Sequence, residues 1–168
     1  MSKVKKKYVE GGEVFCIPLF WIGENYDPTN PLILSKQDDD KIFAFGRAIE
    51  DRGGAGILVE IFDLLGPIRT KCDEIVNSNR LFDPILMFWQ GVRKKRWKVV
   101  CKTANYNKYV DSSYSDIKMV MEEGDGFYLK TFDMGEKSIL SARDASNYES
   151  AKIWHPIQLE KRIAEKIL

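Results

Sequence analysis

The sequence has one histidine, His155, and three cysteines, Cys16, Cys72 and Cys101. A single histidine excludes histidine-rich metal sites and leaves little room for a histidine-dependent catalytic triad. The cysteines are odd in number, far apart and never in a CxxC spacing, which argues against a disulfide framework and a zinc site. We therefore expect three reduced thiols, with Cys16 and Cys101 packed as small apolar side chains.

Long apolar runs and an excess of one charge are also missing. No apolar run approaches the roughly 20 residues that cross a bilayer, and residues 1–12 are basic without the apolar core of a signal peptide. The 26 Lys and Arg against 25 Asp and Glu leave a net charge of +1, so no overall field favours nucleic acid or an anionic membrane. The sequence thus predicts a cytoplasmic protein with no membrane partner.

Familiar catalytic motifs are absent as well, since there is no GxSxG, no HExxH and no kinase-like set. The glycines of residues 53–56 lack the spacing of a phosphate-binding loop, and they join two strands. His155 directly precedes Pro156, which indicates a structural residue at a helix start. We expect no enzymatic activity and no cofactor or metal. Paired carboxylates for hydrolysis stay open, because a sequence does not fix the distance between two acids.

What is present is enough apolar sequence for one core. With 168 residues, 44% of them hydrophobic, the chain is predicted to form a single domain over 1–168. Its first ten residues, 1–10, are a basic leader that we expect to be flexible. A first strand is expected at 13–20, and residues 41–63 read as a β-hairpin through the glycine-rich turn. Three further elements are a strand pair at 84–92 and 96–102 around a solvated basic turn, a short helix within 70–79, and a last hairpin at 127–132 and 137–142.

The clearest helix is the last one, from Pro156 to Leu168. Ile157, Leu159, Ile163 and Ile167 follow helical spacing and predict an apolar stripe packed on a sheet. The predicted fold class is therefore α+β, mainly β: a twisted antiparallel sheet or partly open barrel with a C-terminal amphipathic helix.

Two acidic segments are the candidate partner-binding sites. The connection at 24–40 is longer than most hairpin loops, and Trp21 at its base is a candidate anchor because interfaces favour tryptophan. A solvated insertion without function is an equally weighted reading. The candidate residues are Trp21, Glu24, Asp27, Asp38, Asp39 and Asp40 in the first segment, and Glu122, Glu123 and Asp125 in the second.

A basic turn, Arg93 to Arg96, lies between Trp89 and Trp97. This combination is compatible with contact to a phosphate backbone, but one cluster on a nearly neutral protein is a weak signal, and nucleic acid is not the expected partner. Trp89 and Trp97 are expected in the core, and Trp154 is expected to hold the last helix to the sheet.

Five short motifs occur in an order that resembles the bacterial immunity protein 26 family of polymorphic-toxin systems. They are Gly12-Glu13-Val14-Phe15, Phe45-Gly46-Arg47, Gly56-Ile57-Leu58-Val59, Arg96-Trp97-Lys98-Val99-Val100 and Trp154-His155-Pro156. The sequence departs from the family pattern in the acidic insertion at 24–40, in Cys101 where glycine is expected, and in His155 where a capping aspartate is more usual.

The resemblance implies a non-enzymatic cytoplasmic protein that binds and blocks a cognate toxin domain, with a nuclease as one class of toxin, in contact-dependent inhibition between bacteria. The alternatives are a small nucleic-acid-binding β-barrel protein and, less favoured, a small carboxylate-dependent hydrolase. Nothing in the sequence indicates the oligomeric state or the identity of the toxin.

Overall fold

The computed structural model describes residues 9–24, 27, 29 and 32–168. Of the expected leader at 1–10, only Val9 and Glu10 lie among the described residues, and Val9 is buried. The described part contains a six-stranded sheet and a three-stranded sheet, with short helices between strands and one longer helix at the end. This confirms the predicted class, α+β and mainly β, and the described strands do not close into a barrel.

The large sheet has the strand order β5-β1-β2-β3-β4-β9. All neighbouring strands in it are antiparallel except β4 and β9, which are parallel. Its strands are β1 (Glu13–Pro18), β2 (Phe43–Asp51), β3 (Ile57–Gly66), β4 (Ile85–Met87), β5 (Lys98–Lys102) and β9 (Ile153–Trp154).

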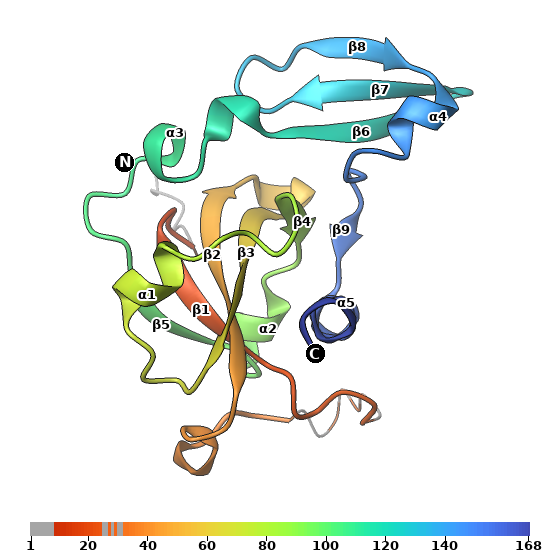
Figure 1. The fold of residues 1–168 in the computed structure, drawn as a ribbon. Coiled ribbons are helices and arrows are strands. Elements are labelled where there is room, and N and C mark those ends of the chain that lie inside the picture. The colour runs from red at the N-terminus through yellow and green to blue at the C-terminus, as the bar shows by residue number, and fades with distance from the viewer. Residues whose placement is uncertain (1–8, 25–26, 28, 30–31) are drawn as a thin grey trace, which may run out of the picture.

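The small sheet joins β6 (Lys118–Glu123), β7 (Gly126–Thr131) and β8 (Lys137–Leu140). It lies beyond one end of the large sheet, and β9 runs from the small sheet back to the last helix (Figure 1). The helices are α1 (Cys72–Val76), α2 (Gln90–Arg93), α3 (Lys108–Asp111), α4 (Ala142–Ala145) and α5 (Pro156–Ile167), with 3-10 turns η1 (Lys36–Asp38), η2 (Gly53–Ala55) and η3 (Tyr114–Asp116).

Both faces of the large sheet are covered, which explains why β1 to β3 read as nearly continuous apolar runs. On one face, Phe15 and Ile17 pack with Leu159 and Ile163 of α5. Because successive strand residues point to opposite faces, Val14 and Cys16 pack on the other side, beneath α1. A third cluster, which includes Ile49, Leu58, Tyr114 and Met119, fills the space between the two sheets.

The hairpin predicted over 41–63 is confirmed as β2 and β3, joined through η2. Gly46 is needed at its centre, because a Cβ there would lie 2.6 Å from Cζ of Phe15. The absence of a side chain at Gly46 thus makes room for the Phe15 ring. The strand expected at 13–20, the short helix within 70–79 and the hairpin of β7 and β8 are also present.

The predicted pairing of 84–92 with 96–102 is wrong. Strand β4 pairs with β3, whereas β5 pairs with β1 at the opposite edge of the sheet. Residues 90–93 form α2 instead of extending the strand, and a Cβ on Gly91 would lie 2.8 Å from Cδ2 of Trp97. After α2 the chain enters β5, which forms the edge of the sheet beside β1.

The expectation of three reduced thiols is also wrong. Cys72 at the start of α1 and Cys101 in β5 form a disulfide, with their Cα atoms 6.2 Å apart. They are 29 residues apart in the sequence, and they meet because α1 covers the sheet face beside the β5 edge. Cys16 is the free cysteine, and it is buried as expected.

The final helix is confirmed, and its apolar stripe faces the sheet. Leu159 and Ile163 are fully buried, Ile167 packs against the same cluster, and Ile157 is half-buried. His155 caps the helix, since the Ile157 N–H donates to its Nδ1 at 3.4 Å. Burial, together with the charges of Lys94 and Arg96, lowers the pKa of His155, so the ring accepts this hydrogen bond in its neutral form.

Candidate functional site

The described residues of the acidic segment at 24–40 lie at the end of the large sheet opposite the small sheet (Figure 1). Within it, Asp38 is buried and builds the turn η1. The backbone N–H of Ser35 donates to Asp38 Oδ2 at 2.9 Å, and Lys41 Nζ lies 2.8 Å from Oδ1. The hydrogen bond from Lys41 holds the pKa of Asp38 below its usual value. Asp38 therefore shapes the segment rather than presenting its charge to a partner.

The other acids of this segment are more accessible. Asp40 is exposed and pairs with Arg69, and Asp39 is half-buried. Glu24 and Asp27 are exposed, and Asp27 accepts a hydrogen bond from the backbone N–H of Thr29 at 2.9 Å. The predicted set is thus divided between one buried turn residue and four acids that reach solvent.

Exposed apolar side chains accompany these acids. Ile22, Ile33 and Ile42 are 37%, 51% and 50% exposed, respectively. Single exposed apolar side chains are common on protein surfaces, so these three residues do not by themselves distinguish a binding surface from a solvated loop. We use the name loop surface for the apolar and acidic residues in and beside this segment that reach solvent: Trp21, Ile22, Glu24, Asp27, Ile33, Asp39, Asp40 and Ile42. The cations Lys36 and Lys41 are exposed among them.

Trp21 is half-buried at the base of the segment. The guanidinium carbon of Arg96 lies 5.2 Å from the centre of the Trp21 ring, within the range of a cation–π contact. Phe20 meets the same ring edge-on, with 4.9 Å between ring centres. Trp21 is therefore held by its neighbours and still reaches solvent.

Arg96 belongs to a buried ion pair with Glu160 of α5. Its Nε and Nη2 donate to the two carboxylate oxygens at 2.8 Å each, and Trp97 Nε1 donates to the Oε1 of Glu160 at 2.8 Å. Arg96 and Glu160 are 7% and 1% exposed. The expectation that the whole basic turn is solvated is therefore wrong for Arg96, because a matching carboxylate from a distant helix pairs with it.

The second predicted segment lies far from the first. Glu122 and Glu123 are exposed at the end of β6, and Asp125 is exposed in the turn to β7. Glu123 pairs with Lys137 of β8 at 2.7 Å. This turn is at the small-sheet end of the molecule (Figure 1), so the structure does not bring the two acidic segments together.

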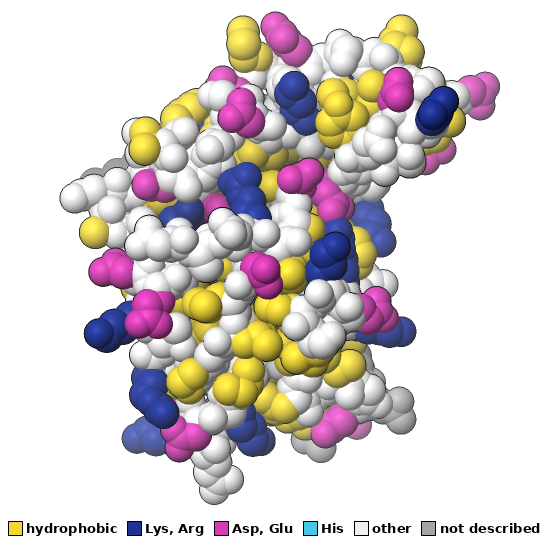
Figure 2. Space-filling model, in the orientation of Figure 1, with side chains coloured by type: hydrophobic (Ala, Val, Ile, Leu, Met, Phe, Trp, Pro, Cys, Tyr) yellow, Lys and Arg dark blue, Asp and Glu magenta, His cyan; other side chains and the backbone are white. Residues whose placement is uncertain are grey.

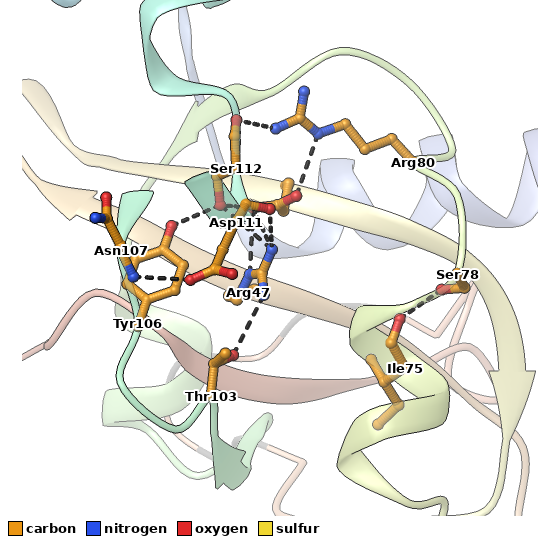
Figure 3. A network of polar contacts seen from close by, with 10 residues as sticks. Arg47, Ile75, Ser78, Arg80, Thr103, Tyr106, Asn107, Asp111 and Ser112 are labelled. Carbon is orange, nitrogen blue, oxygen red and sulfur yellow. Dashed lines mark hydrogen bonds and ion pairs between the residues drawn. The ribbon is translucent and has the colours of Figure 1, made fainter. Parts of the chain in front are cut away.

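A polar network that sequence reasoning missed brings Arg47, Arg80 and Ser112 together inside the fold (Figure 3). All three bind Glu60. Arg47 Nε lies 3.3 Å from Glu60 Oε2, and Arg80 Nε lies 3.2 Å from Oε1. Ser112 donates to Glu60 and contacts the hydroxyl of Tyr106 at 2.6 Å. The network fastens the connection around Tyr106 and Ser112 to the large sheet.

The chemistry of this network is structural. Ser112 is 1% exposed, and its hydroxyl is bonded to Glu60 and Arg47 with no histidine near it. A serine nucleophile needs both access to substrate and a base that accepts its proton. Burial also raises the pKa of Tyr106 to about 12, so its hydroxyl stays protonated. These groups satisfy one another's hydrogen bonds within the protein.

The sequence does contain a signal for the two buried carboxylates that were not predicted, Glu60 and Glu160. Glu60 is the one charged residue in the apolar run from Ile57 to Phe62, and Glu160 falls on the apolar stripe of α5 beside Leu159 and Ile163. A charged residue on a buried face needs a partner, so such positions predict an internal ion pair. The identity of each partner could not be read from the sequence.

Metal binding, membrane insertion and nucleic-acid binding find little support in the part of the chain that the structure describes. Its His, Cys, Asp and Glu side chains form no cluster of three that could hold a metal ion. No described helix is both long and apolar enough to cross a membrane. Acidic and basic side chains alternate over the face drawn in Figure 2, without the continuous basic stripe that a nucleic-acid footprint requires.

Comparison with known proteins gives one match. A family model described as Immunity protein 26 matches residues 10–126, which run from before β1 to the first residue of β7. The match contains the first four motifs noted in the sequence, and Trp154-His155-Pro156 falls outside it. No curated protein and no solved structure matches the chain.

Proposed function

Since the chain belongs to the immunity protein 26 family, we propose that it binds and neutralises a cognate bacterial toxin domain and so protects the cell that produces it. The family match is the observation that carries this proposal. A role as a binding inhibitor, without catalysis, is supported by the internal pairing of Glu60, Ser112 and Glu160.

The motifs of the family serve the fold. Gly46 makes room for Phe15, Arg47 pairs with Glu60, and Trp97 stacks on Phe15 with 5.7 Å between ring centres. Gly46, Arg47 and Trp97 are buried, so they present little surface to a toxin. We therefore assign toxin recognition to surface residues outside these motifs.

The loop surface is our first candidate for recognition. Its exposed acids, Glu24, Asp27 and Asp40, favour a partner with a basic surface, and Trp21 supplies an aromatic anchor. A nuclease toxin fits this description, since such a domain carries a basic cleft for its own substrate. In this proposal Asp38 acts indirectly by holding η1, and Asp39 contributes from the edge.

The turn formed by Glu122, Glu123 and Asp125 is the second candidate surface. It lies on the small sheet, where Ile139 is 82% exposed and Met134 is 72% exposed. Exposed apolar and acidic groups therefore occur at both ends of the molecule. Replacing the exposed acids by lysine at one end at a time shows which of the two surfaces contacts the toxin.

We place the encounter in the cytoplasm of the producing cell, within a polymorphic-toxin system that acts by contact-dependent inhibition. The disulfide between Cys72 and Cys101 argues against this location, because such bonds persist mainly in oxidising compartments. The number of free thiols in protein taken directly from the cytoplasm tests the location. Three free thiols would fit a cytoplasmic protein, and one would mean that the disulfide forms there despite the reducing conditions.

The deciding experiment is co-expression with the toxin domain encoded beside this chain. Cells that make the toxin domain alone are expected to stop growing, and cells that also make this protein are expected to grow and to yield a complex of the two. The exposed-site variant Lys161→Ala serves as a control that must protect equally well. Loss of protection by wild-type protein that circular dichroism shows to be folded would overturn the proposed function.

A further inference from the structure

Three segments that are distant in the sequence meet behind Trp21. Trp21 follows β1, Arg96 precedes β5 and Glu160 lies in α5. The ring of Trp21 rests on the guanidinium of Arg96, whose carbon is 5.2 Å from the ring centre. Arg96 is in turn bound through two nitrogens to Glu160, at 2.8 Å each.

The guanidinium has little freedom in this arrangement. Two parallel hydrogen bonds to one carboxylate fix the plane of an arginine head group. The carboxylate is itself fixed, because Trp97 Nε1 donates to its Oε1 at 2.8 Å and Glu160 is only 1% exposed. The surface on which Trp21 stacks is therefore a rigid part of the core.

We infer that Arg96 and Glu160 are positioning residues for Trp21, and that they hold this aromatic anchor in its toxin-binding orientation before the toxin arrives. The inference rests on the proposed function, in which the loop surface contacts the toxin. An anchor that is ordered in advance loses less side-chain freedom on binding, so the complex forms with less entropic cost. Without the Arg96 platform, the edge-on contact with Phe20 remains, and the Trp21 ring gains freedom that must be lost during each encounter.

In this arrangement, a residue outside the family match over 10–126 also contributes to toxin binding. Arg96 and Trp97 lie inside the family match, whereas Glu160 lies outside it. The C-terminal helix thus controls the orientation of a residue that follows the first strand. An alternative reading is that Trp21 merely covers a buried ion pair, and the two readings differ in what happens to the Trp21 ring.

The first test observes Trp21 directly. Protein labelled with 5-fluorotryptophan gives one fluorine signal for each of its four tryptophans, and Trp21→Phe identifies the signal of Trp21. In the wild-type protein this signal is expected to relax as a rigid ring. Nanosecond mobility of the Trp21 ring in wild-type protein would overturn the inference without any core substitution.

Substitutions in the ion pair then test whether Arg96 and Glu160 order the Trp21 ring. Arg96→Lys and Glu160→Gln are each expected to shift and narrow the Trp21 signal as the ring gains freedom. Arg47→Lys is the matched control, since Arg47 also pairs with a buried glutamate but lies in the other network. An unchanged Trp21 signal in a folded Arg96→Lys or Glu160→Gln protein would contradict a positioning role. If neither variant folds, the mobility of the Trp21 ring in the wild-type protein decides the question.

The functional test uses the neighbouring toxin domain as the probe. Arg96→Lys is expected to raise the dissociation rate of the complex about fivefold, the effect of leaving one side chain to be ordered on binding, while Arg47→Lys leaves it unchanged. If the wild-type protein binds no toxin, the proposed function fails. If the wild-type protein binds and Arg96→Lys dissociates at the same rate, only the positioning role fails.

Discussion

Arg47 and Glu60 face each other directly across β2 and β3, and each is only 2% exposed. Their side chains pair at 3.3 Å, and Arg80 reaches the other oxygen of Glu60 at 3.2 Å. A buried carboxylate thus receives two arginines inside the mainly apolar hairpin. The pair also holds the connection that follows β5, because Arg47 Nη2 donates to the backbone carbonyl of Asp111 at 2.8 Å.

Replacing Glu60 by glutamine should destabilise the protein by about 3 to 5 kcal/mol, because Arg47 would be left buried without its counter-ion. Urea unfolding measures the loss. Glu123→Gln is the matched control, since it breaks an ion pair of comparable distance with Lys137 on the surface, where such pairs contribute about 0 to 1 kcal/mol. Equal effects of the two substitutions would show that burial of the Glu60 network is unimportant.

Ile163→Ala should cost about 2 to 4 kcal/mol, as expected for truncation of a fully buried isoleucine. The reason is the loss of apolar contact between α5 and the large sheet, together with the cavity that remains. Lys161→Ala, on the exposed side of the same helix, should stay within about 0.5 kcal/mol. A loss below that limit for Ile163→Ala would mean that α5 is peripheral to the stability of the fold.

The disulfide should make stability sensitive to reductant. The pair closes a loop between positions 29 residues apart, for which the chain-entropy argument gives about 3 to 4 kcal/mol. The double variant Cys72→Ser with Cys101→Ser should lose this amount and respond no further to dithiothreitol. Denatured wild-type protein should present one thiol to a colorimetric reagent, and three thiols would mean that the pair is reduced.

Stability should also fall at alkaline pH because of Cys16. Burial raises the pKa of its thiol to about 12 from an ordinary value of 9.0, so above about pH 9 the unfolded chain releases a proton that the folded chain retains. The unfolded state then binds fewer protons, and the free energy of unfolding decreases by about 1.4 kcal/mol per pH unit from this group. Cys16→Ala should show a shallower decline between pH 8 and 10. Identical slopes in both proteins would contradict the burial of this thiol.

Charge reversal at the loop surface should slow association with the toxin. Glu24→Lys with Asp40→Lys removes acids that are exposed, so stability should change by less than about 0.5 kcal/mol while association becomes slower and less dependent on salt. Stopped-flow measurements at low and moderate salt give the rates. Glu122→Lys with Asp125→Lys is the comparison at the other end of the molecule, and an effect confined to that variant would move the interface to the small sheet.

The turn residue Asp38 needs a separate variant, because its effects combine fold and charge. Asp38→Asn keeps the shape of the side chain but removes the charge that pairs with Lys41. We therefore keep Asp38 out of the charge-reversal experiment, so that a slower association reports on the exposed acids alone.

The sequence by itself determined the elements whose residues interact locally. The nearly continuous apolar runs of β1 to β3, the glycine-rich turn between β2 and β3, and the stripe of α5 each follow from neighbouring residues, and all are present. His155 before Pro156 correctly indicated a helix start for the same reason. The family resemblance was also readable, since it depends on the order of short motifs and is supported by a match over residues 10–126. That the whole chain folds as one domain stays a prediction.

Only the tertiary structure decided which distant residues meet. The pairing of β5 with β1, the disulfide between Cys72 and Cys101, and the carboxylates that receive Arg47 and Arg96 all join segments far apart in the chain. A single sequence shows that a buried charge or thiol needs a partner, but it does not show which partner the folded chain supplies. Local propensities determine secondary structure within a few residues, whereas these contacts exist only after the sheet order has brought their segments together.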